Sequence, residues 1–119
     1  MERLVRGDVV VLPFSFSDLS QSKKRPAFVV APLQGDDVIL CQITTVAHSD
    51  LYSVLLEEKD FVTGSLKQPS YIHPNRLFTC DIRIIIKRVG SVHQNKIEEV
   101  IKKITMIITG PLTGSGLNS

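Results

Sequence analysis

The chain has 119 residues, of which 43% are hydrophobic, only 6% are aromatic and none is tryptophan. This length predicts one domain with a mainly aliphatic core, and the hydrophobic content excludes an intrinsically disordered chain. A formal net charge of +2 is too small to make the whole surface attract nucleic acid, so a polyanion would have to bind at a local patch.

Six short strands are expected along the chain, each rich in β-branched or other apolar residues and bounded by turn signals. They cover residues 7–14, 26–32, 37–46, 53–58, 70–81 and 82–92. The polar segment 15–25 between the first two strands is expected to be a loop, and a tight turn at LQGDD predicts a hairpin between the second and third strands. The segment KDFVTGSLKQP is turn-like, with room for one short helical turn. Pro74, inside the fifth strand, favours an edge strand or a bulge.

The hydrophobic period changes after residue 92, from that of strands to that of a helix. The apolar residues at helical spacing are Ile97, Val100, Ile101, Ile104, Ile107 and Ile108. Short strands followed by one helix favour a mainly-β fold, a small, strongly bent antiparallel barrel with the helix packed on it, with a sandwich as the alternative. We expect residues 1–109 to form this single domain and residues 110–119, which are rich in Gly, Ser and Thr, to form a flexible tail.

Two further features concern the cellular compartment. The N-terminal sequence MERLVRGD has charges where a signal peptide needs an apolar stretch, and no apolar run approaches the roughly 20 residues that span a bilayer. We therefore expect a soluble, cytoplasmic protein that does not bind a membrane. Cys41 and Cys80 each lie in an expected strand without a second Cys or His at metal-ligand spacing. Buried, reduced thiols are favoured over a disulfide or a metal site.

Arg25 is the first candidate for chemistry, because the sequence contains no P-loop, dinucleotide-binding turn, metal-binding helix or nucleophile elbow. It follows Lys23 and Lys24 and precedes Pro26, which stiffens the backbone and biases Arg25 toward an extended geometry. A guanidinium can grip a phosphate through two parallel hydrogen bonds. From the residues alone, a solvated surface loop is the commoner explanation of such a run of cations.

Thr44 and Thr45 end the third expected strand, in the sequence QITTV. Their hydroxyls could contact phosphate oxygens, although a β-branched Thr is also simply a good strand former. If the second and third strands form a hairpin, Arg25 lies near Thr44, and a cation, a hydroxyl and a lysine-bearing loop converge at one rim. Such a set could stabilise a phosphorane-like charge without a metal.

Two histidines and two aspartates are weaker candidates. His48 and His73 have side chains suited to acid–base chemistry, but a surface or structural role is the more usual one for a lone histidine. Asp18, in the expected loop, and Asp81, in the sequence TCD, could hold Arg or Lys side chains in place or could be turn residues.

Three stretches of the sequence, RGDVVVLPFSFSDLSQSKKRPAFVVAP, VILCQITT and SYIHPNRLFTCD…IIIKRVGSV, resemble the MazF/PemK family of type II toxin–antitoxin toxins. The resemblance covers residues 6 to 105. It implies an SH3-like barrel with a C-terminal helix, usually found as a homodimer and neutralised by a cognate antitoxin. It also implies cleavage of single-stranded RNA, such as mRNA, without metal or other cofactor, to give 2′,3′-cyclic phosphate and 5′-hydroxyl ends.

The same resemblance places the essential Arg and Thr of the family at Arg25 and Thr44. It implies that Arg25 stabilises the pentavalent phosphate and takes part in proton transfer, and that Thr44 donates a hydrogen bond to the phosphate. The further candidates for RNA binding are Lys23, Lys24, Thr45, Asp18, Arg76 and Asp81. The loop SFSDLSQSKKRP and Phe78 depart from better-studied members. A non-cleaving binding module, a gyrase poison and an inactive toxin-derived domain remain alternatives on the same fold.

Overall fold

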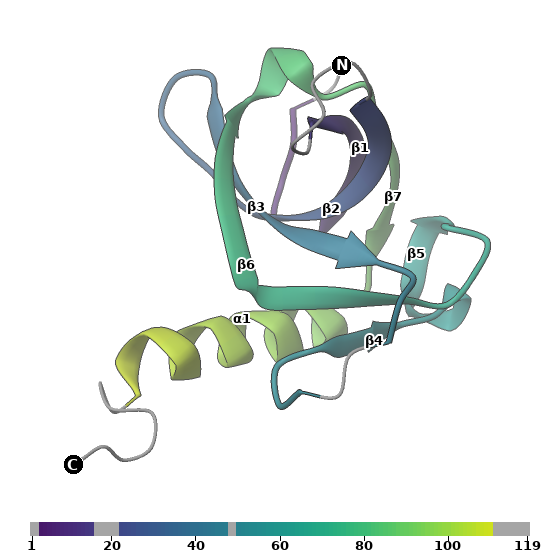
Figure 1. Ribbon diagram of the computed structural model, residues 1–119, viewed down its shortest axis with the longest axis vertical. Coiled ribbons are helices and arrows are strands. Elements are labelled where there is room, and N and C mark those ends of the chain that lie inside the picture. The colour runs from purple at the N-terminus through teal and green to yellow at the C-terminus, as the bar shows by residue number, and fades with distance from the viewer. Residues whose placement is uncertain (1–2, 16–21, 48–49, 111–119) are drawn as a thin grey trace.

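The computed structural model of the chain describes residues 3–15, 22–47 and 50–110. These residues form a single antiparallel sheet in the strand order β4-β6-β3-β2-β1-β7-β5, followed by one α-helix (Figure 1). The strands are β1 (Asp8–Ser15), β2 (Ser22–Pro32), β3 (Asp37–Thr44), β4 (Val54–Leu56), β5 (Phe61–Gly64), β6 (Ser70–Asp81) and β7 (Lys87–Val92). The helical elements are the 3-10 turns η1 (Glu58–Asp60) and η2 (Ile82–Ile84) and the helix α1 (Gln94–Thr109).

The sheet curls strongly on itself, and α1 lies across it below β6 (Figure 1). The predicted fold class, a mainly-β bent antiparallel barrel with a C-terminal helix, is therefore confirmed. Two of the predicted site residues, Asp18 and His48, lie outside the described residues, as do positions 111–119 of the predicted tail. Within the part of the chain that the structure describes, no helix is long and apolar enough to cross a membrane.

Several predicted strand bounds differ from those observed, and one strand was missed. Strand β2 begins at Ser22, so Lys23 and Lys24 lie in a strand that the sequence suggested was a loop. The reason is that β1 is long enough to pair with this segment, with Phe14 opposite Lys23 and Pro13 opposite Lys24. The short strand β5 lies in the segment predicted to be turn-like, directly after η1, and the strand predicted at 82–92 begins only at Lys87, after η2.

The bulge predicted from Pro74 is present in β6. This strand pairs with both β3 and β4, so it is not at an edge. Its ladder with β3 passes from Cys41 opposite Leu77 to Ile43 opposite Ile72, so the register between these two strands shifts across residues 73–76. Because proline has no N–H to give to a ladder, a bulge is where an internal strand accommodates it.

Successive side chains of a strand point to opposite faces of the sheet, and the apolar ones form one cluster on each face. The first contains Phe28 and Val30 of β2, and it is completed by Val100 and Ile104 of α1. The second cluster contains the intervening β2 residues Ala27 and Val29 with Leu12 of β1 and Leu40 of β3. Both faces of the central strands are therefore buried, which fixes their register strongly.

Cys41 and Cys80 belong to different faces of the sheet. Cys41 is fully buried in the first cluster, and Cys80 is half-buried against the second. Both are free thiols, and burial raises the pKa of each above its ordinary value. The predicted buried, reduced state is confirmed for Cys41, and both thiols are poor nucleophiles because the thiolate form is disfavoured.

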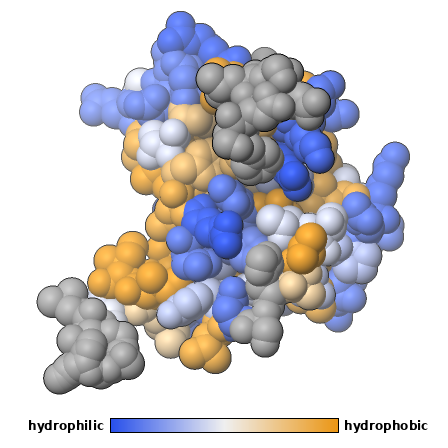
Figure 2. Space-filling model, viewed as in Figure 1, coloured by the Kyte–Doolittle hydropathy of each residue, from blue (hydrophilic) through white to orange (hydrophobic). Residues whose placement is uncertain are grey.

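The apolar stripe of α1 is only partly covered by the barrel. Val100 and Ile104 are buried, whereas Ile107 is 36% exposed and Ile108 is 66% exposed. Figure 2 shows this as a hydrophobic surface over the C-terminal half of α1. The sequence alone could not decide whether this stripe is fully used by the core, and the structure shows that its C-terminal end is not.

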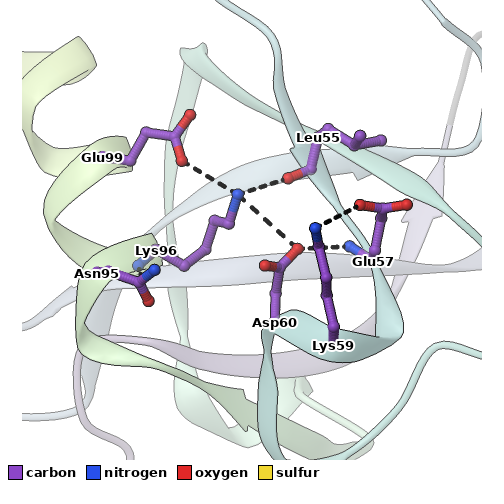
Figure 3. A network of polar contacts seen from close by, with 7 residues as sticks. All are labelled: Leu55, Glu57, Lys59, Asp60, Asn95, Lys96 and Glu99. Carbon is purple, nitrogen blue, oxygen red and sulfur yellow. Dashed lines mark hydrogen bonds and ion pairs between the residues drawn. The ribbon is translucent and has the colours of Figure 1, made fainter.

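Lys96 joins the N-terminal half of α1 to β4 and η1 (Figure 3). Lys96 Nζ donates hydrogen bonds to Leu55 O at 2.9 Å and to Glu99 Oε1 at 3.0 Å, and lies 3.8 Å from Asp60 Oδ2. Asp60 Oδ2 also accepts a bond from the Glu57 backbone N–H at 2.7 Å. The Lys96 ammonium therefore neutralises the Asp60 carboxylate, which also accepts the hydrogen bond that closes η1.

We expect Lys96→Met to lower the free energy of unfolding by about 2 kcal/mol, because the Lys96 side chain is only 12% exposed and its loss leaves Asp60 without its nearby cation. Lys59→Met is the matched control, since Lys59 reaches Glu57 from a side chain that is 78% exposed. It should change stability by less than about 0.5 kcal/mol. Urea denaturation measures both. Equal losses would contradict the role of Lys96 as a clamp.

Candidate active site

A small pocket lies where the second apolar cluster ends. On one face of the sheet the cluster includes Leu12, Ala27 and Leu40, and the next residues on that face are polar or aromatic. The pocket has a volume of about 150 Å³ and is lined by Phe14, Arg25, Pro26, Gln42, Ile43, Thr44 and Arg76. This is below the roughly 300–1,000 Å³ of most small-molecule sites, so the pocket suits a small group such as a phosphate.

The strand pairing brings Arg25 and Thr44 to the same pocket. Ala27 of β2 lies opposite Gln42 of β3 in an antiparallel pair. Arg25 comes two residues before Ala27, and Thr44 comes two residues after Gln42, so both lie on the same side of this pair. Both line the pocket. Arg25 is half-buried, and its Nε atom is shielded from solvent. The neighbourhood expected from a hairpin between these strands is therefore present.

Phe14 forms an apolar wall of the pocket. Its ring packs edge-on against Phe78 of β6, with the ring centroids 5.2 Å apart and an interplanar angle of 79°. Phe78 is half-buried against the second cluster. Phe78 supports the pocket wall through Phe14, and it does not itself line the pocket.

The hydroxyl of Thr44 is connected to a buried histidine. Thr44 Oγ1 lies 3.0 Å from His73 Nε2 and 3.2 Å from the Val46 carbonyl oxygen. His73 is only 1% exposed, and it is the first residue of the bulge at 73–76. Of the surface and structural roles expected for a lone histidine, the structural one fits His73, because its ring is buried beside the end of β3.

A second link leads from His73 to a surface carboxylate. His73 Nδ1 lies 3.4 Å from Ser53 Oγ, and Ser53 Oγ donates to Asp50 Oδ1 at 2.9 Å. The backbone N–H groups of Ser53 and Tyr52 also donate to Asp50, and these bonds hold the pKa of Asp50 below its ordinary value. Sequence reasoning missed Ser53 and Asp50, and a His-Pro pair inside a strand was the only signal for this network.

The remaining candidates for RNA binding are spread over two regions. Lys23 and Lys24, near the start of β2, and Thr45, just after β3, are exposed at the end of the sheet that carries the pocket. Arg76 is exposed and lines the pocket directly. Lys23 and Arg25 are two residues apart in β2 and therefore lie on one face of the sheet, whereas Lys24, between them, lies on the other.

Asp81 lies away from this pocket. It stands opposite Asp37, at the far end of β3 from Thr44. Its carboxylate accepts two bonds from the Arg83 guanidinium, at 3.0 and 2.6 Å, and one from the Arg83 backbone N–H at 2.8 Å. These bonds lower the pKa of Asp81 to about 2. Asp81 thus holds an arginine side chain and caps η2, which was one of the two roles predicted for it.

The pocket presents two guanidinium groups and a hydroxyl from three strands. Arginine side chains stay charged at every physiological pH and can donate several hydrogen bonds in one plane. A phosphodiester seated among Arg25, Arg76 and Thr44 would meet donors on more than one side. The chemistry suited to these donors is binding of a phosphate and stabilisation of charge that develops on it.

Residues 5–108 match the family model described as PemK-like, MazF-like toxin of type II toxin–antitoxin system. No curated protein sequence matches this chain. Among solved structures, an endoribonuclease in complex with its cognate antitoxin, from a mycobacterial species, is 16% identical with a TM-score of 0.71, covering 92% of this chain and 98% of that one.

Two other solved structures are similar over nearly their whole length. A MazE–MazF complex from Deinococcus radiodurans is 19% identical with a TM-score of 0.71, covering 88% of this chain and 95% of that chain. The Mycobacterium tuberculosis toxin MazF-mt6 is 13% identical with a TM-score of 0.66, covering 85% and 95% respectively. At these identities the structural matches establish the fold.

Proposed function

We propose, because this chain belongs to the PemK-like, MazF-like toxins of type II toxin–antitoxin systems, that it is an endoribonuclease that cleaves single-stranded RNA without a metal. The observation that carries this proposal is that Arg25 and Thr44 line one small pocket, although they come from different strands. Guanidinium and hydroxyl donors around a phosphate-sized pocket are what a phosphodiester cleavage site requires.

In the proposed reaction the ribose 2′-hydroxyl attacks the adjacent phosphorus, and the bond from phosphorus to the 5′-oxygen breaks. The 2′-hydroxyl loses its proton and the 5′-oxygen gains one, so the products are a 2′,3′-cyclic phosphate and a 5′-hydroxyl. Arg25 stabilises the charge on the pentavalent phosphorus and takes part in proton transfer, while Thr44 donates a hydrogen bond to a phosphate oxygen.

Exposed cations beside the pocket support binding of an extended RNA. Arg76 lines the pocket, and Lys23, Lys24 and Thr45 are exposed at the same end of the sheet. We propose that these residues contact phosphates on either side of the cleaved bond, which would make RNA affinity fall as salt rises. Asp81 has no place in this set, because its carboxylate binds Arg83 at the other end of β3.

Incubating the purified protein with mixed single-stranded RNA in EDTA tests the proposal. We expect fragments with 5′-hydroxyl and 2′,3′-cyclic phosphate ends, formed at the same rate with and without the chelator. Sequencing the fragment ends would give the cleavage motif. Intact RNA retarded in a gel would instead indicate the non-cleaving binding module, and intact RNA with trapped DNA breaks in the presence of gyrase would indicate a gyrase poison.

We further propose that the protein is a cytoplasmic homodimer that a cognate antitoxin neutralises. The exposed apolar end of α1, with Met106 and Ile108, supplies surface that a partner could cover. Complexes with an antitoxin are also known for two of the similar structures. A small acidic reading frame just upstream of the gene, whose product suppresses cleavage when mixed with this protein, would support the proposal. A monomeric mass in light scattering would contradict the dimer.

A further inference from the structure

The proton on His73 Nδ1 can be assigned from the contacts of Ser53. Asp50 is a carboxylate whose pKa is held below its ordinary value by the N–H groups of Ser53 and Tyr52, so it accepts hydrogen bonds and cannot donate them. The Ser53 hydroxyl therefore gives its single proton to Asp50, 2.9 Å away. In the contact between Ser53 Oγ and His73 Nδ1, the ring nitrogen must then be the donor.

With Nδ1 protonated, the state of Nε2 decides what the Thr44 hydroxyl can do. When the ring is neutral, Nε2 is an acceptor, and Thr44 gives its proton to the ring across the 3.0 Å contact. When the ring is protonated, Nε2 donates to Thr44 Oγ1, and the Thr44 proton turns to the Val46 carbonyl oxygen at 3.2 Å or to an anion in the pocket. The second state leaves the Thr44 proton available to a phosphate without taking a hydrogen bond away from Nε2.

We propose that His73 is a positioning residue that sets the proton direction of Thr44, so that Thr44 can donate to a phosphate when His73 is protonated. This inference deepens the proposed function and rests on it. By linkage, a phosphate in the pocket favours the protonated ring, because it binds the state in which Thr44 is a donor. Ser53 and Asp50 belong to the same device, since they fix the Nδ1 proton.

Charged groups on the surrounding elements bear on the protonation of His73. Asp50, directly before β4, faces it through Ser53 and favours the cation. Arg25 of β2 and Arg76 of β6 line the pocket beyond Thr44 and oppose the cation until an anion enters. Lys103 of α1 donates to the Leu51 carbonyl oxygen, next to Asp50 in sequence, and weakens the field of that carboxylate.

The proton arrangement can be tested without RNA. In ¹H–¹⁵N spectra of protein labelled in its histidine rings, the His73→Gln variant identifies the His73 signals. We expect the neutral ring of His73 to carry its proton on Nδ1, and the Ser53→Ala variant to shift the population toward the Nε2–H form. A neutral ring with its proton on Nε2 in the wild type would overturn the inference, whether or not RNA is cleaved.

The effect on the reaction is tested by the pH dependence of single-turnover cleavage. In His73→Gln an amide can donate to Thr44 at every pH, so cleavage by this variant should lack the titration that His73 gives to the wild type. Because the ratio of variant to wild-type rates cancels other ionisations, it should rise by about tenfold or more between about pH 5 and pH 8. A ratio that stays flat overturns the inference, whereas a wild type that cleaves nothing at any pH overturns the proposed function.

Discussion

Replacing Arg25 with alanine is expected to lower the rate of RNA cleavage by at least about a thousandfold, the usual cost of removing a group that stabilises charge in a phosphoryl-transfer transition state. Arg25 lines the pocket together with Thr44, and a methyl group there cannot reach a phosphate. The midpoint of thermal unfolding should fall by only a few degrees, because Arg25 lies at the end of the core and is half-buried.

Two further variants separate the charge of Arg25 from its shape. Arg25→Lys keeps a cation but loses the planar fork, so it should recover only a small part of the lost rate. Lys59→Met removes a cation on η1, outside the lining of the pocket, and should cleave like the wild type. A cleavage rate for Arg25→Ala within tenfold of the wild-type rate would contradict the assignment of Arg25 as a catalytic residue.

The elements that the sequence predicted well are those with long, regular patterns. The bounds 70–81 predicted for β6 are those observed, the bulge at Pro74 is present, and the helix predicted from six apolar positions is α1. Hydrophobic alternation over many residues determines both the type of element and the face that it buries. The approach of Arg25 to Thr44 followed from the same patterns, since pairing of two strands brings their ends together.

What the sequence could not predict depends on partners far away in the chain. β5 has only four residues and exists because it pairs with β7, which lies more than 20 residues further on. Lys23 and Lys24 lie in a strand because β1 supplies a ladder, whatever their own polarity suggests. Tertiary pairing overrides local composition at both sites.

The role of His73 was hidden for a related reason. Its burial depends on the bulge, and its hydrogen bonds depend on Thr44 and Ser53, which lie 29 and 20 residues away in the sequence. A single histidine followed by proline gives no sign of which side chains will surround the ring. The network that orients the hydroxyl of Thr44 is therefore visible only in three dimensions, although the hydroxyl itself could be chosen from the sequence.

The largest effect on stability is expected at Gly64, the last residue of β5. Its φ is +74°, and a Cβ built there would lie 1.9 Å from the Val89 carbonyl oxygen. That oxygen accepts a hydrogen bond from the Ser65 N–H at 3.3 Å, so the clash falls on a contact that joins the end of β5 to β7. We expect Gly64→Ala to lower the free energy of unfolding, measured in urea, by about 3 kcal/mol or more.

Gly35 supplies the control that separates backbone strain from the clash. It also has a positive φ, +83°, but a Cβ there would meet nothing within 4 Å. Gly35→Ala should therefore cost only about 1 kcal/mol, the penalty of placing an alanine in the left-handed region. The difference between the two variants measures how closely β5 must approach β7. Equal losses would mean that β5 can move away from β7 at no cost. The edge strand β5 would then be held more loosely than its pairing with β7 implies.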